Sequence, residues 1–202
     1  CMAMMAASAF FFLSFNMVEG KWKTSLLVSG LITFIAAVHY YYMRDYWSEV
    51  GESPTFFRYV DWTLTVPLMC VEFYLILKAA GAQTGLLWKL IWASVVMLVT
   101  GYLGEAVYTT GTGPAMWGLF SGLAYFWMAY EVGCLSIFGG PSGAVGNALT
   151  SGSGKIPEAG RMLQWFVLVG WAIYPIGYMA GTEGWYSFVA IDEGAMNIIY
   201  NI

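Results

Sequence analysis

The stretch RYVDWTLTVPLMCVEFYLIL, from Arg58 to Leu77, is apolar enough for a membrane-spanning helix, yet it contains one arginine and two carboxylates. A helix needs about 20 mainly apolar residues to cross the hydrocarbon of a bilayer. An ionised side chain at the centre of such a helix costs about 2.5–3.5 kcal/mol on insertion scales. The three ionisable residues Arg58, Asp61 and Glu72 therefore indicate a function that needs charge inside the membrane.

The composition of the whole chain is typical of a membrane protein. Of its 202 residues, 59% are hydrophobic and only 10% are charged, whereas soluble domains usually carry about 25% charged residues. The eight lysines and arginines are scattered and form no basic patch, so we expect no nucleic-acid partner. With one histidine and no CxxC motif, we also expect no metal site.

Apolar segments predict an all-α membrane protein, a bundle of seven transmembrane helices with no second domain in residues 1–202. The first six predicted spans are residues 1–18, Thr24–Met43, Pro54–Leu77, Leu86–Val107, Pro114–Phe138 and Pro157–Ala180. A seventh is expected to begin at Ser187 and to continue past Ile202. Residues 139–155, which are rich in Gly and Ser, are predicted to form a loop.

Every lysine falls at one end of the predicted bundle, and the opposite loops are mainly acidic, Glu105 among their acids. These lysines are Lys21, Lys23, Lys78, Lys89 and Lys155. The positive-inside rule makes their end cytoplasmic. The N-terminus is then outside, and the third span runs from outside to inside.

The acids of the third span are predicted to share one face of its helix. Asp61 and Glu72 are roughly 16 Å apart along the axis and within about 20° of the same direction, with Thr65 between them. Arg58 precedes Asp61 by three residues and can neutralise it. A solvated helix end with a structural ion pair would explain Arg58 and Asp61, but it would not explain Glu72.

Glu72 has apolar neighbours and no basic residue within a turn. Burial there favours the neutral, protonated form of a carboxyl group. An ionised acid near an arginine and a protonated acid deeper in the same helix make a proton acceptor and a proton donor. His39 lies in the outer half of the second span, where it is either a packed, hydrogen-bonded residue or a partner of Asp61.

Several motifs resemble the microbial rhodopsins, and within them the proteorhodopsin group. RYVDWTLTVP followed by EFYLIL resembles the third helix of that group. The other matching stretches are GKWKTSLLVSG (20–30), VMLVTGYLGEA (96–106), GWAIYPIGY (170–178) and NIIYN (197–201). The similarity covers nearly all of the chain, so it does not depend on one motif.

The resemblance implies seven helices around all-trans retinal, which a lysine of the seventh helix holds as a protonated Schiff base. Asp61 would be the counterion and proton acceptor, Glu72 the cytoplasmic donor, and His39 a hydrogen-bond partner of Asp61. Arg58 would stabilise the counterion cluster, and Thr65 between the two acids is typical of proton pumps. The residues implied to line retinal are Trp62, Met69, Met97, Trp171, Tyr174 and Pro175.

Two further implications concern colour and attachment. An apolar residue at the position of Met69 goes with green absorption in this group, and Gln goes with blue. The retinal lysine and a second counterion aspartate are expected just past Ile202. The lysines within the sequence all lie in or beside predicted loops, so none of them is expected to hold retinal.

The buried acids and the resemblance together indicate a light-driven outward proton pump rather than an enzyme. The resemblance also implies a multi-pass protein of the bacterial inner membrane, in contact with lipid and assembled as a pentamer or hexamer. A photosensory rhodopsin that signals to a partner protein is the alternative, although sensory members usually lack a carboxyl donor such as Glu72. A retinal-free transporter or membrane scaffold is a third possibility.

Overall fold

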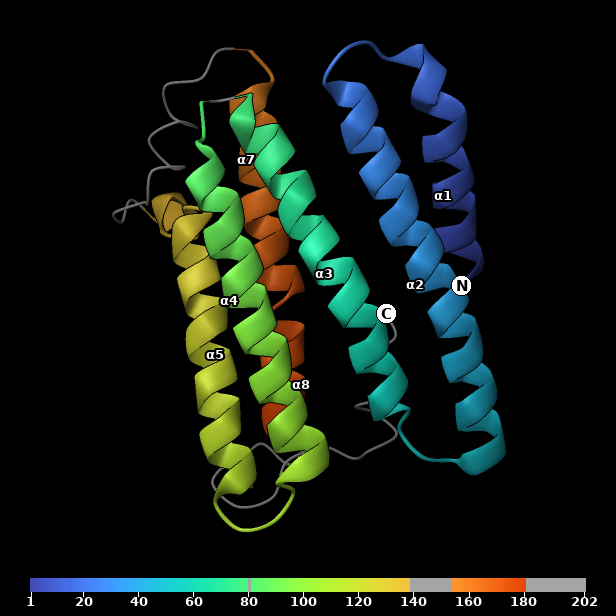
Figure 1. Cartoon of the computed structure of the whole chain (residues 1–202), viewed down its shortest axis with the longest axis vertical. Coiled ribbons are helices and arrows are strands. Elements are labelled where there is room, and N and C mark those ends of the chain that lie inside the picture. Colours follow the sequence, from blue (N-terminus) through green and yellow to red (C-terminus); the bar gives the residue numbers. More distant parts are fainter. Residues whose placement is uncertain (80, 139–153, 181–202) are drawn as a thin grey trace.

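The computed structural model describes residues 1–79, 81–138 and 154–180, and all regular structure within these ranges is helical. The elements run antiparallel along one long axis (Figure 1). The α-helices are α1 (Met2–Ser14), α2 (Trp22–Val50), α3 (Thr55–Lys78), α4 (Thr84–Tyr102), α5 (Gly113–Glu131), α7 (Ile156–Trp165) and α8 (Ile173–Ala180). Short 3-10 turns follow α1 and α5, and π-helical turns at Leu103–Val107 and Phe166–Gly170 follow α4 and α7.

The first six predicted spans are each helical in the structure. Within the described ranges, four stretches are long and apolar enough to cross a membrane, namely Trp22–Val50, Thr55–Lys78, Thr84–Val107 and Ile156–Met179. The prediction ended the second span too early, because α2 continues through polar residues to Val50 and stops at Gly51. Gly51 has a φ of 75°, the left-handed conformation that commonly ends helices. The predicted seventh span and residues 139–153 lie outside the described residues.

The helices pack so that α3 occupies the middle of the bundle. It contacts α2 on one side and α4 and α7 on the other, while among the described helices α1 packs mainly against the outer side of α2 (Figure 1). The most deeply buried apolar side chains lie among α3, α4, α5 and the sixth span, and include Leu77, Leu90, Met128 and Val167. A polar residue on the inner face of α3 is therefore surrounded by other helices.

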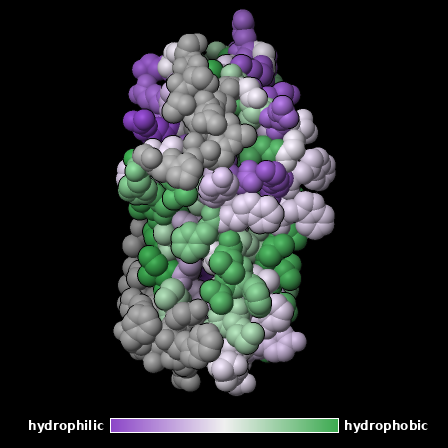
Figure 2. Space-filling view, turned by 90° about the vertical axis from the view of Figure 1, so that its left-hand side faces the viewer, coloured by the Kyte–Doolittle hydropathy of each residue, from purple (hydrophilic) through white to green (hydrophobic). Residues whose placement is uncertain are grey.

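The outside of the bundle is apolar. Large side chains such as Trp92, Phe120 and Phe126 are exposed, and hydrophobic residues cover the middle of the visible face in Figure 2. Hydrophilic residues gather toward the upper end of that view. Such a band is suited to contact with lipid, because hydrocarbon solvates apolar side chains and excludes charged ones.

Candidate functional site

Helix α3 buries a column of polar side chains in the bundle. Arg58, Asp61 and Thr65 are buried, and Glu72 is half-buried. A buried charge is costly unless it is paired and hydrogen-bonded. The partners of these residues therefore decide what the column can do.

His39 and Asp61 come together between α2 and α3. The ring nitrogen Nδ1 of His39 lies 3.1 Å from Oδ1 of Asp61. His39 was expected to be either a packed, hydrogen-bonded residue or a partner of Asp61, and the structure shows the contact with Asp61. The Thr65 hydroxyl donates to the backbone oxygen of Asp61 at 2.9 Å, so its hydrogen bond is to the helix and not to the carboxylate.

Arg58 contacts hydroxyl groups at the start of α3 and an acid of the neighbouring fourth span. Its guanidinium donates to Ser53 Oγ at 3.0 Å and to Thr55 Oγ1 at 3.2 Å. It also forms an ion pair with Glu105, 2.5 Å from Nη2 to Oε1. The spacing of Arg58 and Asp61 suggested a pair between these two. The ion pair that the structure describes for Arg58 is with Glu105.

Glu105 is a site residue that the sequence analysis did not identify. The sequence places Glu105 among the acids of the outer loops, whereas the structure places it in the π-helical turn after α4. Its second carboxylate oxygen accepts a hydrogen bond from Tyr59 at 2.9 Å. The sequence did contain a signal for this residue, because Glu105 lies at the end of the apolar run of the fourth predicted span.

Glu72 occupies a separate environment nearer the other end of α3. Its carboxylate accepts a hydrogen bond from the Ser29 hydroxyl of α2, and Ser29 is itself buried. None of the ion pairs among the described residues involves Glu72. The two acids of α3 thus have different partners, a histidine for Asp61 and a hydroxyl for Glu72.

Aromatic rings and methionines flank this helix on its α4 and α8 sides. The rings of Trp62 and Tyr174 are 4.9 Å apart, centroid to centroid. Trp171 lies against Phe73 with centroids 5.7 Å apart. The predicted lining residues Trp62, Met69, Met97, Trp171 and Tyr174 all belong to one apolar cluster. Pro175 follows Tyr174 in α8 and is partly buried.

The arrangement is suited to proton transfer and to holding a flat apolar molecule. Two carboxyl groups lie at different depths, and the aromatic cluster lies beside the helix that bears both. Among the described residues, no group of three His, Cys, Asp or Glu side chains is placed to bind a metal ion.

Comparisons with known proteins agree with this geometry. A family model described as "Bacteriorhodopsin-like protein" matches residues 1–202. The green-light absorbing proteorhodopsin of Gamma-proteobacterium EBAC31A08 is 42% identical over 99% of this chain and 75% of its own length. The blue-light absorbing proteorhodopsin of Gamma-proteobacterium Hot 75m4 is 43% identical over 98% of this chain and 74% of its own. The crystal structure of blue light-absorbing proteorhodopsin from Med12 matches with a TM-score of 0.76 and 41% identity, covering 98% of this chain and 83% of that one.

Proposed function

The chain belongs to the bacteriorhodopsin-like family, and we propose that it is a light-driven proton pump that moves protons outward across a bacterial inner membrane. The supporting observation is that one buried helix carries Asp61 and Glu72 at separate depths, each with its own partner. Intramembrane acids arranged in this way usually mark proton pathways. Proteorhodopsins among its relatives add independent support.

The residues of the aromatic cluster would line all-trans retinal. A long, flat polyene needs apolar surfaces on both sides, and Trp62, Met97, Trp171 and Tyr174 supply rings and a thioether in one cluster beside α3. Met69 and Pro175 complete the proposed lining. When bound, retinal would absorb light and isomerise, so that a proton leaves and later returns to its nitrogen.

The residues of the chain would then move the proton. Asp61 accepts it on the outer side, where the hydrogen bond with His39 orients the carboxyl group. Glu72 supplies a proton from the cytoplasmic side, and the Ser29 hydroxyl holds its carboxyl group in place. Arg58 contributes positive charge on the outer side, and Thr65 stays bound to the α3 backbone between the two acids.

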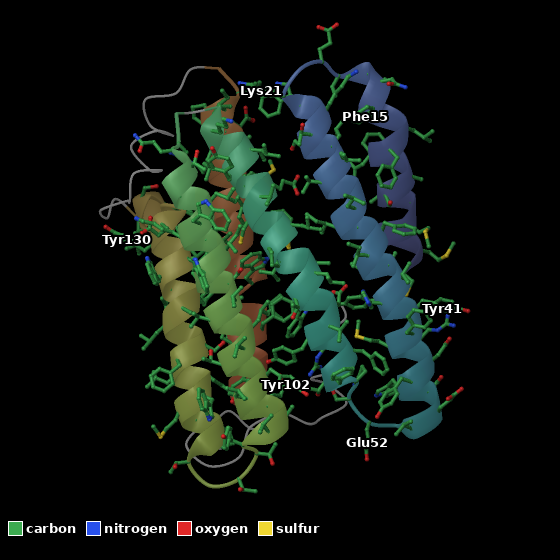
Figure 3. All side chains as sticks on the ribbon, viewed as in Figure 1. Phe15, Lys21, Tyr41, Glu52, Tyr102 and Tyr130 are labelled. Carbon is green, nitrogen blue, oxygen red and sulfur yellow. The ribbon has the colours of Figure 1, made fainter. Side chains whose placement is uncertain are left out.

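The distribution of lysines supports the proposed direction of transport. Lys21 lies at one end of the bundle and Glu52 at the other (Figure 3). The lysine-bearing end is the cytoplasmic one by the positive-inside rule. This orientation places Glu72 toward the cytoplasm, Asp61 toward the outside and the N-terminus outside.

The test measures light-driven acidification of the medium around cells or liposomes that contain the protein and retinal, with the outer side of the protein facing the medium. Wild type should acidify the medium, and Glu72→Gln should slow the photocycle and reduce acidification because its amide cannot donate that proton. Glu158→Gln, at an exposed acid of the cytoplasmic end, is the matched control. Undiminished acidification by Glu72→Gln with an unchanged photocycle would remove Glu72 from its role. Light-induced absorbance changes without net transport would favour the photosensory alternative.

Two finer proposals concern colour and assembly. Green and blue relatives are about equally similar to the chain, so identity does not decide the colour. We propose green absorption because Met69 is apolar, and Met69→Gln should then move the band toward blue in an absorption spectrum. We also propose a pentamer or hexamer, which the mass of the complex in mild detergent would test.

A further inference from the structure

The sixth span carries charge only near one of its ends. Its first helix, α7, begins at the end of the bundle that bears Lys21 (Figure 1, Figure 3), and its charged residues are Glu158 and Arg161. Residues 162–179 contain no charged side chain. As a helix they are about 27 Å long, close to the thickness of about 30 Å of the hydrocarbon in a bilayer. Arg161 therefore marks the depth at which the hydrocarbon ends and the lipid headgroups begin.

Arg161 brings a positive charge to this depth that no described acid neutralises. Its side chain is exposed, and none of the ion pairs among the described residues involves it. Glu158, three residues earlier, is spaced to pair with it on the helix surface. The structure instead pairs Glu158 with Lys155, whose Nζ lies 2.9 Å from Oε2 of the acid. Lys155 and Glu158 offset each other, so the charge of Arg161 remains.

A hollow in the surface adjoins the Arg161 side chain. It has a volume of about 560 Å³ and is lined by Pro157, Glu158, Arg161, Met162 and Trp165. Ligand pockets usually have volumes of about 300–1,000 Å³, so a phosphate-bearing headgroup has room there. The guanidinium of an arginine binds phosphate oxygens through two parallel hydrogen bonds.

An apolar stripe continues from this hollow along the sixth span. Its members are exposed and mostly three or four residues apart, which keeps them near one side of a helix. They are Met162, Trp165, Phe166, Val169, Ile173 and Ile176. The exposed ring of Phe138 widens the stripe, because its centroid lies 6.4 Å from that of Trp165. Trp165 lies one turn below Arg161, and tryptophans are enriched where hydrocarbon meets headgroups.

We propose that this surface binds one anionic phospholipid. The phosphate lies in the hollow against the Arg161 guanidinium, and an acyl chain follows the apolar stripe. Charge complementarity favours phosphatidylglycerol over phosphatidylcholine, because only the former brings a net negative charge to the positive charge of Arg161. Basic pockets at the ends of transmembrane helices bind anionic headgroups in the same way. This binding requires neither retinal isomerisation nor proton transport.

A simpler role for Arg161 would be to fix the orientation of the helix while its guanidinium is solvated by water. That role predicts equal contact of the stripe with charged and with uncharged lipids. The two roles therefore differ in lipid selectivity, which can be measured directly.

The experiment uses the retinal-bound full chain in phosphatidylcholine nanodiscs. Two probes are added in separate samples, phosphatidylglycerol and phosphatidylcholine, each with a photoactivatable group in one acyl chain. Mass spectrometry of peptides then locates the attached lipid. We expect the phosphatidylglycerol probe to label residues 162–169 about fivefold more than the phosphatidylcholine probe, the factor that one basic residue contributes near an anionic membrane surface.

Three variants assign this selectivity to the arginine. Arg161→Gln should lower labelling by phosphatidylglycerol about fivefold, to the level of phosphatidylcholine. Arg161→Lys keeps the charge but loses the two parallel hydrogen bonds, so its labelling should lie between wild type and Arg161→Gln. Lys21→Gln, which removes an exposed charge from the same end of the bundle, should match wild type.

Equal labelling of residues 162–169 by the two probes in wild type would overturn the inference, and so would unchanged labelling in Arg161→Gln. Labelling by neither probe, with cross-links between two copies at this stretch, would show that a second copy covers the stripe and would also overturn it. Should Arg161→Gln fail to fold, the comparison of the two probes on wild type decides. Light-driven acidification tests the proposed pump separately from all of these outcomes.

Discussion

Tyr125→Phe tests how the sixth span is held at its π-helical turn. In a π-helical turn the hydrogen bonds shift by one residue, and some backbone oxygens are left without their usual partners. The Tyr125 hydroxyl of α5 donates to two backbone oxygens of this turn, Val167 O at 2.9 Å and Leu168 O at 3.1 Å. Tyr125 is buried, and Val167 is fully buried, so water cannot easily replace the lost hydroxyl.

The expected loss of stability is about 1 kcal/mol. Hydrogen bonds between transmembrane helices contribute about 0.6 kcal/mol on average and up to about 1.7 kcal/mol. The Tyr125 hydroxyl shares one proton between two acceptors, so its contribution to stability should lie between these values. Removing the oxygen leaves the ring in place, so the packing loss is small.

Unfolding in mixed micelles with increasing SDS, followed by circular dichroism, measures this free energy. Tyr130→Phe is the control, because Tyr130 is exposed on the same helix. It should stay within about 0.5 kcal/mol of wild type, as surface substitutions usually do. The reasoning is refuted if Tyr125→Phe is as stable as wild type or loses no more than Tyr130→Phe.

The same unfolding assay tests three further predictions. Leu90→Ala should cost about 2 kcal/mol of stability, because Leu90 is fully buried. This is the low end of the range for buried leucines, since a leucine that leaves the protein core of a membrane protein still meets apolar lipid. A loss below about 0.5 kcal/mol would contradict this prediction. Gly118→Ala should destabilise the folded protein, because the added Cβ would overlap a tyrosine ring of α8. Gly122→Ala should stabilise it by up to about 1 kcal/mol, because the added Cβ would meet no described atom within 4 Å. Equal effects of the two substitutions would refute the packing argument. Lys89→Met removes the ion-pair partner of Glu131, whose side chain is 10% exposed and lies 2.9 Å from the lysine nitrogen. It should cost about 1 kcal/mol of stability, a value between those of exposed and of buried ion pairs. An unchanged unfolding midpoint would show that the pair contributes nothing to stability.

Local patterns were sufficient to predict the six helical spans within the described residues and the polar face of α3. Hydropathy over about 20 residues identifies a span, and helical periodicity alone places Asp61, Thr65 and Glu72 on one side. The aromatic and methionine residues could be chosen only through the resemblance, because rings at helical spacing occur in any buried core. Their common cluster beside α3 came from the packing of α4 and α8.

Contacts between segments that are distant in the sequence could not be predicted from local patterns. Ser29 with Glu72, His39 with Asp61 and Arg58 with Glu105 each join residues that are 22 or more positions apart. Such pairs depend on how far each helix is rotated and shifted against its neighbour, and hydropathy carries no information on either. The chain's own pattern therefore established which groups are ionisable inside the membrane, and the packing of the helices established which partner each of them meets.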